Sequence, residues 1–132
     1  MRGLDTNVLV RYLAADDPAQ FAAADRVVEE SRKRQEPLFL PAPVLCELVW
    51  VLARTYKQTN AAIVALLEHI LDEQLFRIEH DAAVRRSLRA YRDGKASFAD
   101  YLIGEISREA GCRDTVTFDG ALRGTGGFTV LS

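Results

Sequence analysis

The chain has 132 residues, a formal net charge of −2, 48% hydrophobic residues and 27% charged residues. This length fits one domain with a sizeable core, and the ordinary composition excludes a disordered chain. No stretch approaches the roughly 20 apolar residues that a membrane-spanning helix needs, and the N-terminal segment lacks the apolar core of a signal peptide. We therefore expect a single cytoplasmic domain over residues 1–132, with no membrane segment.

Strand-like and helix-like segments alternate along the chain. In chain order, we expect a strand at 2–5 followed by an apolar run at 8–10, a helix at 17–33, a strand at 37–40, helices at 44–56 and 60–73, a strand at 75–78, helices at 81–91 and 97–111, and strands at 115–118 and 128–131. Strands separated by helices predict parallel βα units. The expected fold class is α/β, a three-layer α/β/α sandwich.

Local signals mark several helix ends. Asp17-Pro18 combines a cap residue with proline at the first helical position, and Gly111 is expected to end the helix that Ser97 opens. Asn60 and Asp81 are predicted as the caps of two further helices.

Two aspartates are expected where buried strands end. Asp5 follows the first strand, and Asp119 follows the strand at 115–118, with Thr117 on the same side of the strand. Active sites of such sheets lie beyond the carboxyl ends of the strands. The alternative for Asp5 is a helix cap, and for Asp119 it is a plain turn residue.

Glu47 stands alone in an apolar helix. It is the only charged residue between Glu36 and Arg54, so we expect its carboxylate to be buried. A buried carboxylate needs a cation, because leaving it unpaired costs several kcal/mol. The cation is either an arginine in a structural ion pair or a metal ion.

Asp100 has two compatible roles. It lies three residues after Ser97, close to a capping box, and an acid in the first turn suits the helix dipole. It is also the fourth member of a widely spaced acidic set.

These four acids together predict a metal site. Two carboxylates about 4 Å apart repel by about 4 kcal/mol at an effective dielectric constant near 20, so clustered acids need a divalent cation. Oxygen ligands suit Mg²⁺ or Mn²⁺. The two cysteines and the two histidines show no zinc-binding spacing.

At these residues the chain resembles the PIN-domain family, specifically the VapC-type toxin ribonucleases of bacterial toxin–antitoxin pairs. The resemblance covers essentially the whole chain. It is carried, in order, by Leu4-Asp5-Thr6-Asn7-Val8-Leu9, Glu47 in its apolar helix, Phe98-Ala99-Asp100 and Thr117-Phe118-Asp119. The fold that it implies is a central parallel five-stranded sheet between helices.

The resemblance also implies the activity, a Mg²⁺-dependent endoribonuclease in which Mn²⁺ substitutes and metal-activated water attacks an RNA phosphodiester. The implied partners are the RNA substrate, a small antitoxin protein that covers the acidic pocket, and a second copy in a homodimer. The implied catalytic and metal-binding residues are Asp5 and Asp100 as direct ligands, Glu47 and Asp119 as further acids of which one orients the water, and Thr6 and Thr117 as supporting residues.

Basic and glycine-rich segments give weaker indications. Arg85, Arg89 and Arg92 fall at helical spacing, which fits either a solvated face or an RNA-binding stripe. Arg32-Lys33-Arg34 is expected to complement a helix C-terminus. Gly124-Thr125-Gly126-Gly127 precedes a strand rather than a helix, so it predicts a turn and not a phosphate-binding loop.

Two other function classes remain open. A non-catalytic interaction module would pair Glu47 with an arginine and use the aspartates as caps. A phospho-acceptor or phosphatase domain would use Asp5 as acceptor or nucleophile, although Asn7 stands where one such phosphatase class has a second aspartate.

Overall fold

The computed structural model describes residues 1–132. Helices and short strands alternate, as the sequence predicts. The elements are β1 (Arg2–Gly3), α1 (Thr6–Ala14), α2 (Pro18–Arg34), β2 (Leu38–Leu40), α3 (Ala42–Arg54), α4 (Asn60–Asp72), β3 (Phe76–Ile78), α5 (Asp81–Asp93), α6 (Phe98–Glu109), β4 (Thr115–Thr117), the 3-10 turn η1 (Gly120–Leu122) and β5 (Phe128–Val130). No helix is long and apolar enough to cross a membrane.

The strands are parallel but form two separate sheets. One sheet has the order β1-β2-β3, and the other contains only β4 and β5. The parallel α/β class is therefore confirmed, whereas the predicted five-stranded central sheet is wrong. β1 is short because α1 begins at Thr6, and β4 packs on α6 instead of joining β1.

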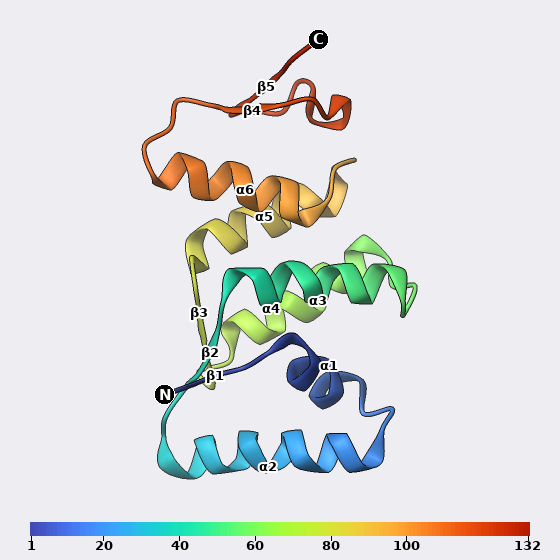
Figure 1. The fold of residues 1–132 in the computed structure, drawn as a ribbon, viewed down its shortest axis with the longest axis vertical. Coiled ribbons are helices and arrows are strands. Elements are labelled where there is room, and N and C mark those ends of the chain that lie inside the picture. Colours follow the sequence, from blue (N-terminus) through green and yellow to red (C-terminus); the bar gives the residue numbers. More distant parts are fainter.

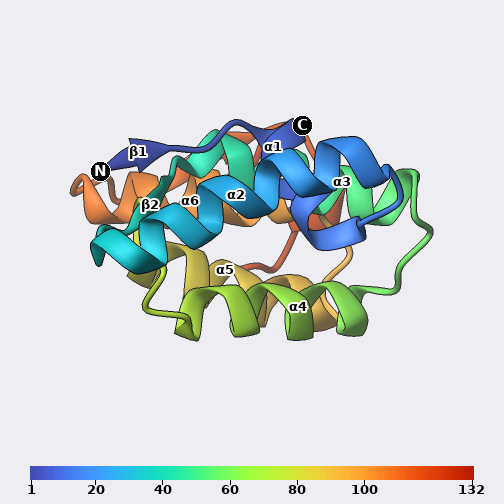
Figure 2. The ribbon, with the colours of Figure 1, turned by 90° about the horizontal axis from the view of Figure 1, so that it is seen from below.

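The layers are stacked along the longest axis of the molecule. In Figure 1, α2 lies at one end, followed by α1, by α3 and α4 beside the three-stranded sheet, by α5 and α6, and by β4 and β5 at the other end. Seen from below, α4 and α5 lie side by side, away from α2 (Figure 2). This stack replaces the simple three-layer sandwich that the sequence predicts.

Several helix signals act as expected. Asp17 is the N-cap of α2, where its side chain accepts a hydrogen bond from the Gln20 N–H, and Pro18 is the first helical residue. The basic run of residues 32–34 occupies the last turn of α2. Gly111 lies just past α6 with φ +94°, and its N–H donates to the Arg108 carbonyl.

Three local predictions are wrong. Thr59, not Asn60, caps α4, because the Asn60 amide donates instead to the Tyr91 carbonyl of α5. His80, not Asp81, is the N-cap of α5. The apolar run at 8–10 is helical, since Thr6, Leu9 and Val10 recur at helical spacing on the buried face of α1.

One core joins most of the elements. β2 contributes Leu38 and Leu40, both fully buried, and η1 contributes Leu122, which is 1% exposed. The C-terminal segment is thus anchored in the same core as the first sheet.

Candidate acidic site

The four predicted acids lie on elements that contact one another in series. Asp5 precedes α1, Glu47 is in α3, Asp100 is in α6 and Asp119 follows β4. Helix α1 packs on α3, α3 contacts α6, and α6 contacts β4. The acids are therefore carried by successive layers of the stack in Figure 1.

Asp5 occupies the N-cap position of α1 without acting as a cap. Its backbone is extended (φ −79°, ψ 157°), yet its side chain accepts no hydrogen bond from the helix. The exposed carboxylate is thus not used by the local structure. The next residue, Thr6, is only 4% exposed, and its Oγ1 has no hydrogen-bond partner. A buried hydroxyl in this state costs about 1–3 kcal/mol.

Glu47 is exposed, so the prediction of a buried carboxylate is wrong. Helix α3 buries Leu45, Leu48 and Leu52, whereas the face that carries Glu47 and Trp50 points to solvent, with Trp50 59% exposed. An apolar helix sequence predicts that a residue is buried only if other elements cover every face of that helix. Glu47 takes part in none of the arginine–carboxylate pairs of the structure.

Asp100 forms the predicted capping box. Its Oδ2 accepts hydrogen bonds from the Ser97 N–H at 3.2 Å and from the Ser97 hydroxyl at 2.9 Å. In return, the Ser97 Oγ accepts from the Asp100 N–H at 3.1 Å. The helix-stabilising role of Asp100 is therefore confirmed.

Asp119 caps η1. Its Oδ1 accepts a hydrogen bond from the Ala121 N–H at 2.9 Å. The Thr117 Oγ1 accepts from the Asp119 N–H at 3.0 Å, so Thr117 holds the backbone of Asp119 rather than its carboxylate.

The acids do not form a metal-binding group within one chain. The structure brings no three His, Cys, Asp or Glu side chains close enough to hold an ion. The carboxylates have suitable oxygen atoms for Mg²⁺ or Mn²⁺, but two of them are engaged as caps. The arrangement in a single chain does not fit a metal centre.

Comparison with known proteins places the chain in a family. The model of the PIN domain matches residues 4–127, which include all four acids. The chain belongs to the PIN-domain family. It is also 30% identical over 118 residues to a VapC ribonuclease of Aquifex aeolicus (strain VF5), an alignment that covers 89% of this chain and 87% of that relative.

The arginine stripe of this PIN domain is partly engaged. Arg85 pairs with Asp81 at 2.7 Å and with Asp72 at 3.0 Å, and it also donates to the Leu71 carbonyl. These hydrogen bonds raise the pKa of Arg85 and tie α5 to the end of α4. Arg89 and Arg92 are exposed.

The same helix carries a second arginine that is held by acidic neighbours. Arg86 pairs with Glu105 at 2.7 Å and with Glu109 at 3.3 Å on α6. Of the four arginines of α5, Arg89 and Arg92 form no ion pair within the chain, so these two are available for contacts with other molecules.

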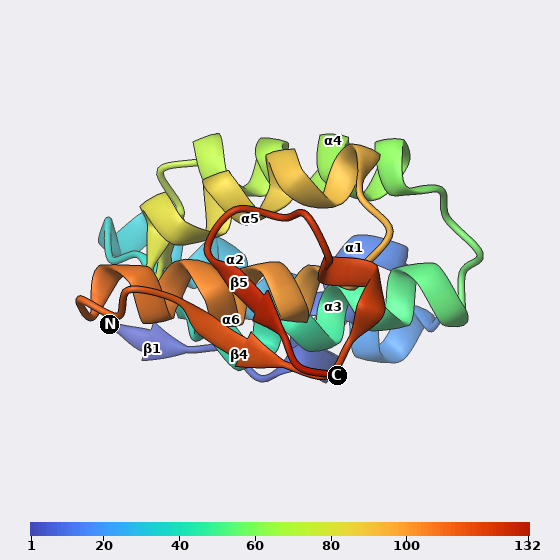
Figure 3. The same ribbon diagram turned by 90° about the horizontal axis from the view of Figure 1, so that it is seen from above.

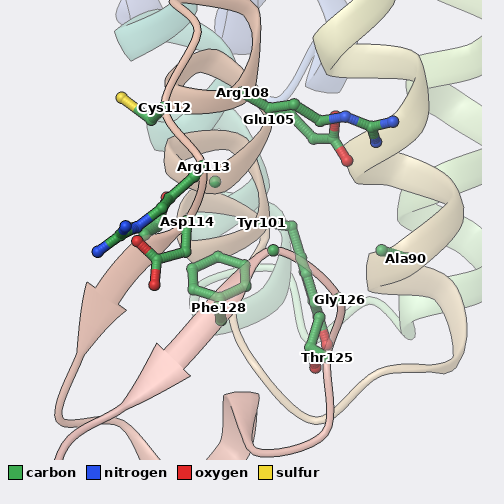
Figure 4. Close-up of a pocket in the computed structure, with 13 residues that line it drawn as sticks. Ala90, Tyr101, Glu105, Arg108, Cys112, Arg113, Asp114, Thr125, Gly126 and Phe128 are labelled. Carbon is green, nitrogen blue, oxygen red and sulfur yellow. The ribbon is translucent and has the colours of Figure 1, made fainter.

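The glycine-rich loop lines a cavity of about 440 Å³ between α6 and β5. In the close-up of Figure 4, Tyr101 points toward Thr125, whereas Arg108 and Arg113 point in different directions. Two cations that diverge do not form an anion site. The prediction of a turn is consistent with Gly124 and Gly127, which have φ of +82° and +87°.

Two polar residues near Glu47 were not predicted. Glu79 and His80 line the same pocket as Glu47, between α3 and α6. Glu79 accepts a hydrogen bond from the Ala42 N–H at 2.8 Å and so caps α3 from a distance. The sequence could have indicated Glu79 as a site residue, because Glu79 directly follows β3, at the carboxyl end of a strand. In the same pocket, burial and the Glu47 charge raise the pKa of the Cys46 thiol.

Proposed function

We propose that this PIN-domain protein is an endoribonuclease that requires a divalent cation, Mg²⁺ or Mn²⁺, and acts as the toxin of a toxin–antitoxin pair. The observation that carries the proposal is the VapC ribonuclease relative, which aligns over most of both chains. The state of Asp5 and Glu47 supports it, because neither carboxylate is used by the fold as a cap or in an ion pair with arginine.

The proposed site residues are Asp5, Glu47, Asp100 and Asp119, with Thr6 beside Asp5. In the proposed function these carboxylates would hold the cation after moving closer together than they lie in this structure, and the cation would supply the chemistry of phosphodiester hydrolysis. The Thr6 hydroxyl, which has no hydrogen-bond partner, provides a further oxygen beside Asp5. Arg89 and Arg92 are the proposed contacts for RNA phosphates, whereas Arg85 is held by its acidic neighbours. The proposed protein partners are an antitoxin over the acidic residues and a second copy.

The test compares RNA cleavage by the wild type, Asp5→Asn and Asp25→Asn with Mg²⁺, with Mn²⁺ and with chelator. Asp25 is a control on α2, outside the proposed site. We expect cleavage that needs the cation and falls by about 100-fold or more in Asp5→Asn, the scale of a lost electrostatic contact in a transition state. Asp25→Asn should cleave like the wild type. Equal cleavage by wild type and Asp5→Asn would refute the proposal.

A second candidate function is a non-catalytic interaction module. It is favoured by one observation, that Asp100 and Asp119 act as helix caps. A purified protein that neither binds Mn²⁺ in calorimetry nor cleaves RNA would support it.

A further inference from the structure

The face of α3 that points to solvent carries three exposed side chains in a line. They are Glu47, Trp50 and Arg54. Positions three and seven residues apart share one face of a helix. At a rise of 1.5 Å per residue, Trp50 lies about 4.5 Å and Arg54 about 10.5 Å beyond Glu47 along the helix axis. An acid, an aromatic ring and a cation therefore follow one another along this face, which we call the α3 stripe.

Trp50, in the middle of the stripe, is unusually exposed for its residue type. It is 59% exposed, although tryptophan is on average a largely buried residue. The aromatic pairs of the structure join Tyr12 to Phe21 and Tyr91 to Phe98, so the Trp50 ring stacks on no other ring of the chain. A planar apolar ring in this state is suited to stack on a nucleobase, because every base has a π-face.

The charges on either side of Trp50 favour a nucleic acid over a protein as its ligand. Arg54 takes part in none of the ion pairs of the structure, so its guanidinium is free to bind a phosphate. Arg54 also lies in the last turn of α3, where a cation suits the helix dipole, and the two roles are compatible. The cores of protein interfaces are depleted in charged residues, whereas proteins that bind single strands combine aromatic rings with cations.

The stripe begins at a groove between α3 and α6. Glu47 of α3 and Ile103 of α6 both line this groove, which has a volume of about 520 Å³. The volume lies within the range of small-molecule sites, about 300–1,000 Å³, so a nucleotide fits there. Seen from above, the C-terminal end of α3 extends beyond α6 (Figure 3). A strand that occupies the groove is therefore free to continue along the α3 stripe.

We infer that the α3 stripe is a binding site for single-stranded RNA, in which one base stacks on the Trp50 ring and a neighbouring phosphate pairs with Arg54. The inference deepens the proposed nuclease function and rests on it for the choice of RNA as the ligand. Stacking on Trp50 needs an unpaired base that can be splayed out of its strand, which a base inside a duplex is not. The stripe thus selects single-stranded segments and holds them one helical turn from Glu47.

The chain contains its own probe for the test, because Trp50 is its only tryptophan. The tryptophan fluorescence of the wild type is titrated in chelator, so that binding is measured without cleavage. The ligands are a short oligouridylate, the same strand paired with oligoadenylate, and an abasic strand of equal length. We expect the single strand to quench the emission, and the duplex and the abasic strand to leave it unchanged.

Substitutions separate stacking from charge, with a labelled oligouridylate as the ligand. Trp50→Ala should weaken binding by about 5-fold to 150-fold, which corresponds to about 1–3 kcal/mol, whereas Trp50→Phe keeps a ring and should retain most of the affinity. Arg54→Ala should lower the slope of log affinity against log salt by about 0.7. Arg26→Ala, at an exposed arginine of α2 that forms no ion pair, is the matched control and should bind like the wild type. All these positions are exposed, so the melting temperatures should stay close to that of the wild type.

Wild-type emission that the single strand does not quench, or a Trp50→Ala protein that binds as tightly as the wild type, overturns the inference. A blue shift of the emission as protein concentration rises without RNA also overturns it, because Trp50 would then be covered by protein. If Trp50 binds RNA but added Mg²⁺ or Mn²⁺ brings no cleavage, the proposed nuclease function fails while the binding site stands. Cleavage without quenching gives the opposite result, so the two failures are distinguishable.

Discussion

Asp100 and Asp5 show how two acids with similar sequence contexts differ in structure. Both stand at the start of a helix, but Asp100 is locked in a reciprocal capping box with Ser97 and Asp5 makes no capping hydrogen bond. A change at Asp100 therefore affects stability as well as any function. A change at Asp5 leaves the local hydrogen bonds intact, which makes it the cleaner probe of activity.

Ser97→Ala is expected to lower the free energy of unfolding by about 1 kcal/mol, the usual cost of losing an N-cap side chain. The Ser97 hydroxyl both accepts from the Asp100 N–H and donates to its carboxylate. Urea denaturation measures the change. Ser107→Ala, further along α6, is the control and should leave stability nearly unchanged; an equal loss in both variants would contradict a capping role.

Asp16 is expected to give a pH-dependent contribution to stability. The Tyr56 hydroxyl donates to Asp16 at 2.8 Å and lowers the pKa of that carboxyl below its ordinary value of 3.8. A lowered pKa in the folded state means that the stabilisation is present above the unfolded pKa and lost as pH falls through the folded value. Tyr56→Phe removes the largest cause of this stabilisation and leaves the contact of Asp16 with Arg11 in place.

The measurement is thermal unfolding of wild type and Tyr56→Phe across pH. We expect a constant stability difference above about pH 5 that shrinks as the pH falls below 3.8. A difference that persists unchanged to the acid limit would mean that the lost interaction does not involve the Asp16 charge.

At the scale of elements, the packing of β5 on α6 depends on the absence of a side chain. Gly104 lies within α6, where alanine would ordinarily be preferred by about 1 kcal/mol. The Phe128 ring occupies the space that a Cβ would need. The contact therefore favours glycine at a position where helix propensity alone does not.

Gly104→Ala is expected to destabilise the protein by up to about 2 kcal/mol, because overpacking costs about 1–3 kcal/mol and the helix propensity of alanine returns about 1 kcal/mol, and to increase hydrogen exchange in β4 and β5. Gly120→Ala is the matched control, because an added Cβ there meets nothing within 4 Å. Hydrogen exchange with mass spectrometry, beside urea denaturation, distinguishes local release of the C-terminal unit from general loss of stability. A Gly104→Ala protein as stable as the wild type would show that Phe128 does not anchor the unit.

At the scale of the whole molecule, the five strands form two separate sheets. The fold carries the four acids on consecutive layers but brings no three of them into a metal-binding group. Association with the proposed second copy would make stability depend on protein concentration.

The melting temperature is expected to rise with protein concentration. Each tenfold increase stabilises a dimer by about 1.4 kcal/mol, which corresponds to about 2–3 °C for two chains of this length. Val116→Lys should weaken the dependence, because it places a charge on an apolar side chain of β4 that is 57% exposed. Ala65→Lys, on an exposed position of α4, should preserve it. A melting temperature independent of concentration over two decades would argue for a monomer.

The sequence by itself determined the features that depend on neighbours within a few residues. These include the start of α2 at Asp17-Pro18, the capping box of Ser97 and Asp100, the alternation of helices with parallel strands, and the motifs that identify the PIN-domain family. Such signals are hydrogen bonds and apolar spacings within one or two turns of chain, so they survive in any tertiary arrangement.

Only the tertiary structure decided which faces are covered. Four features depend on residues far apart in the chain. They are the exposure of Glu47, the hydrogen bond from Asn60 to α5, the pairing of Arg85 with Asp72, and the division of five strands between two sheets. An apolar run shows that a surface prefers burial but does not specify which surface buries it. For the same reason, the motifs predicted four acidic site residues without showing how far apart the fold holds them.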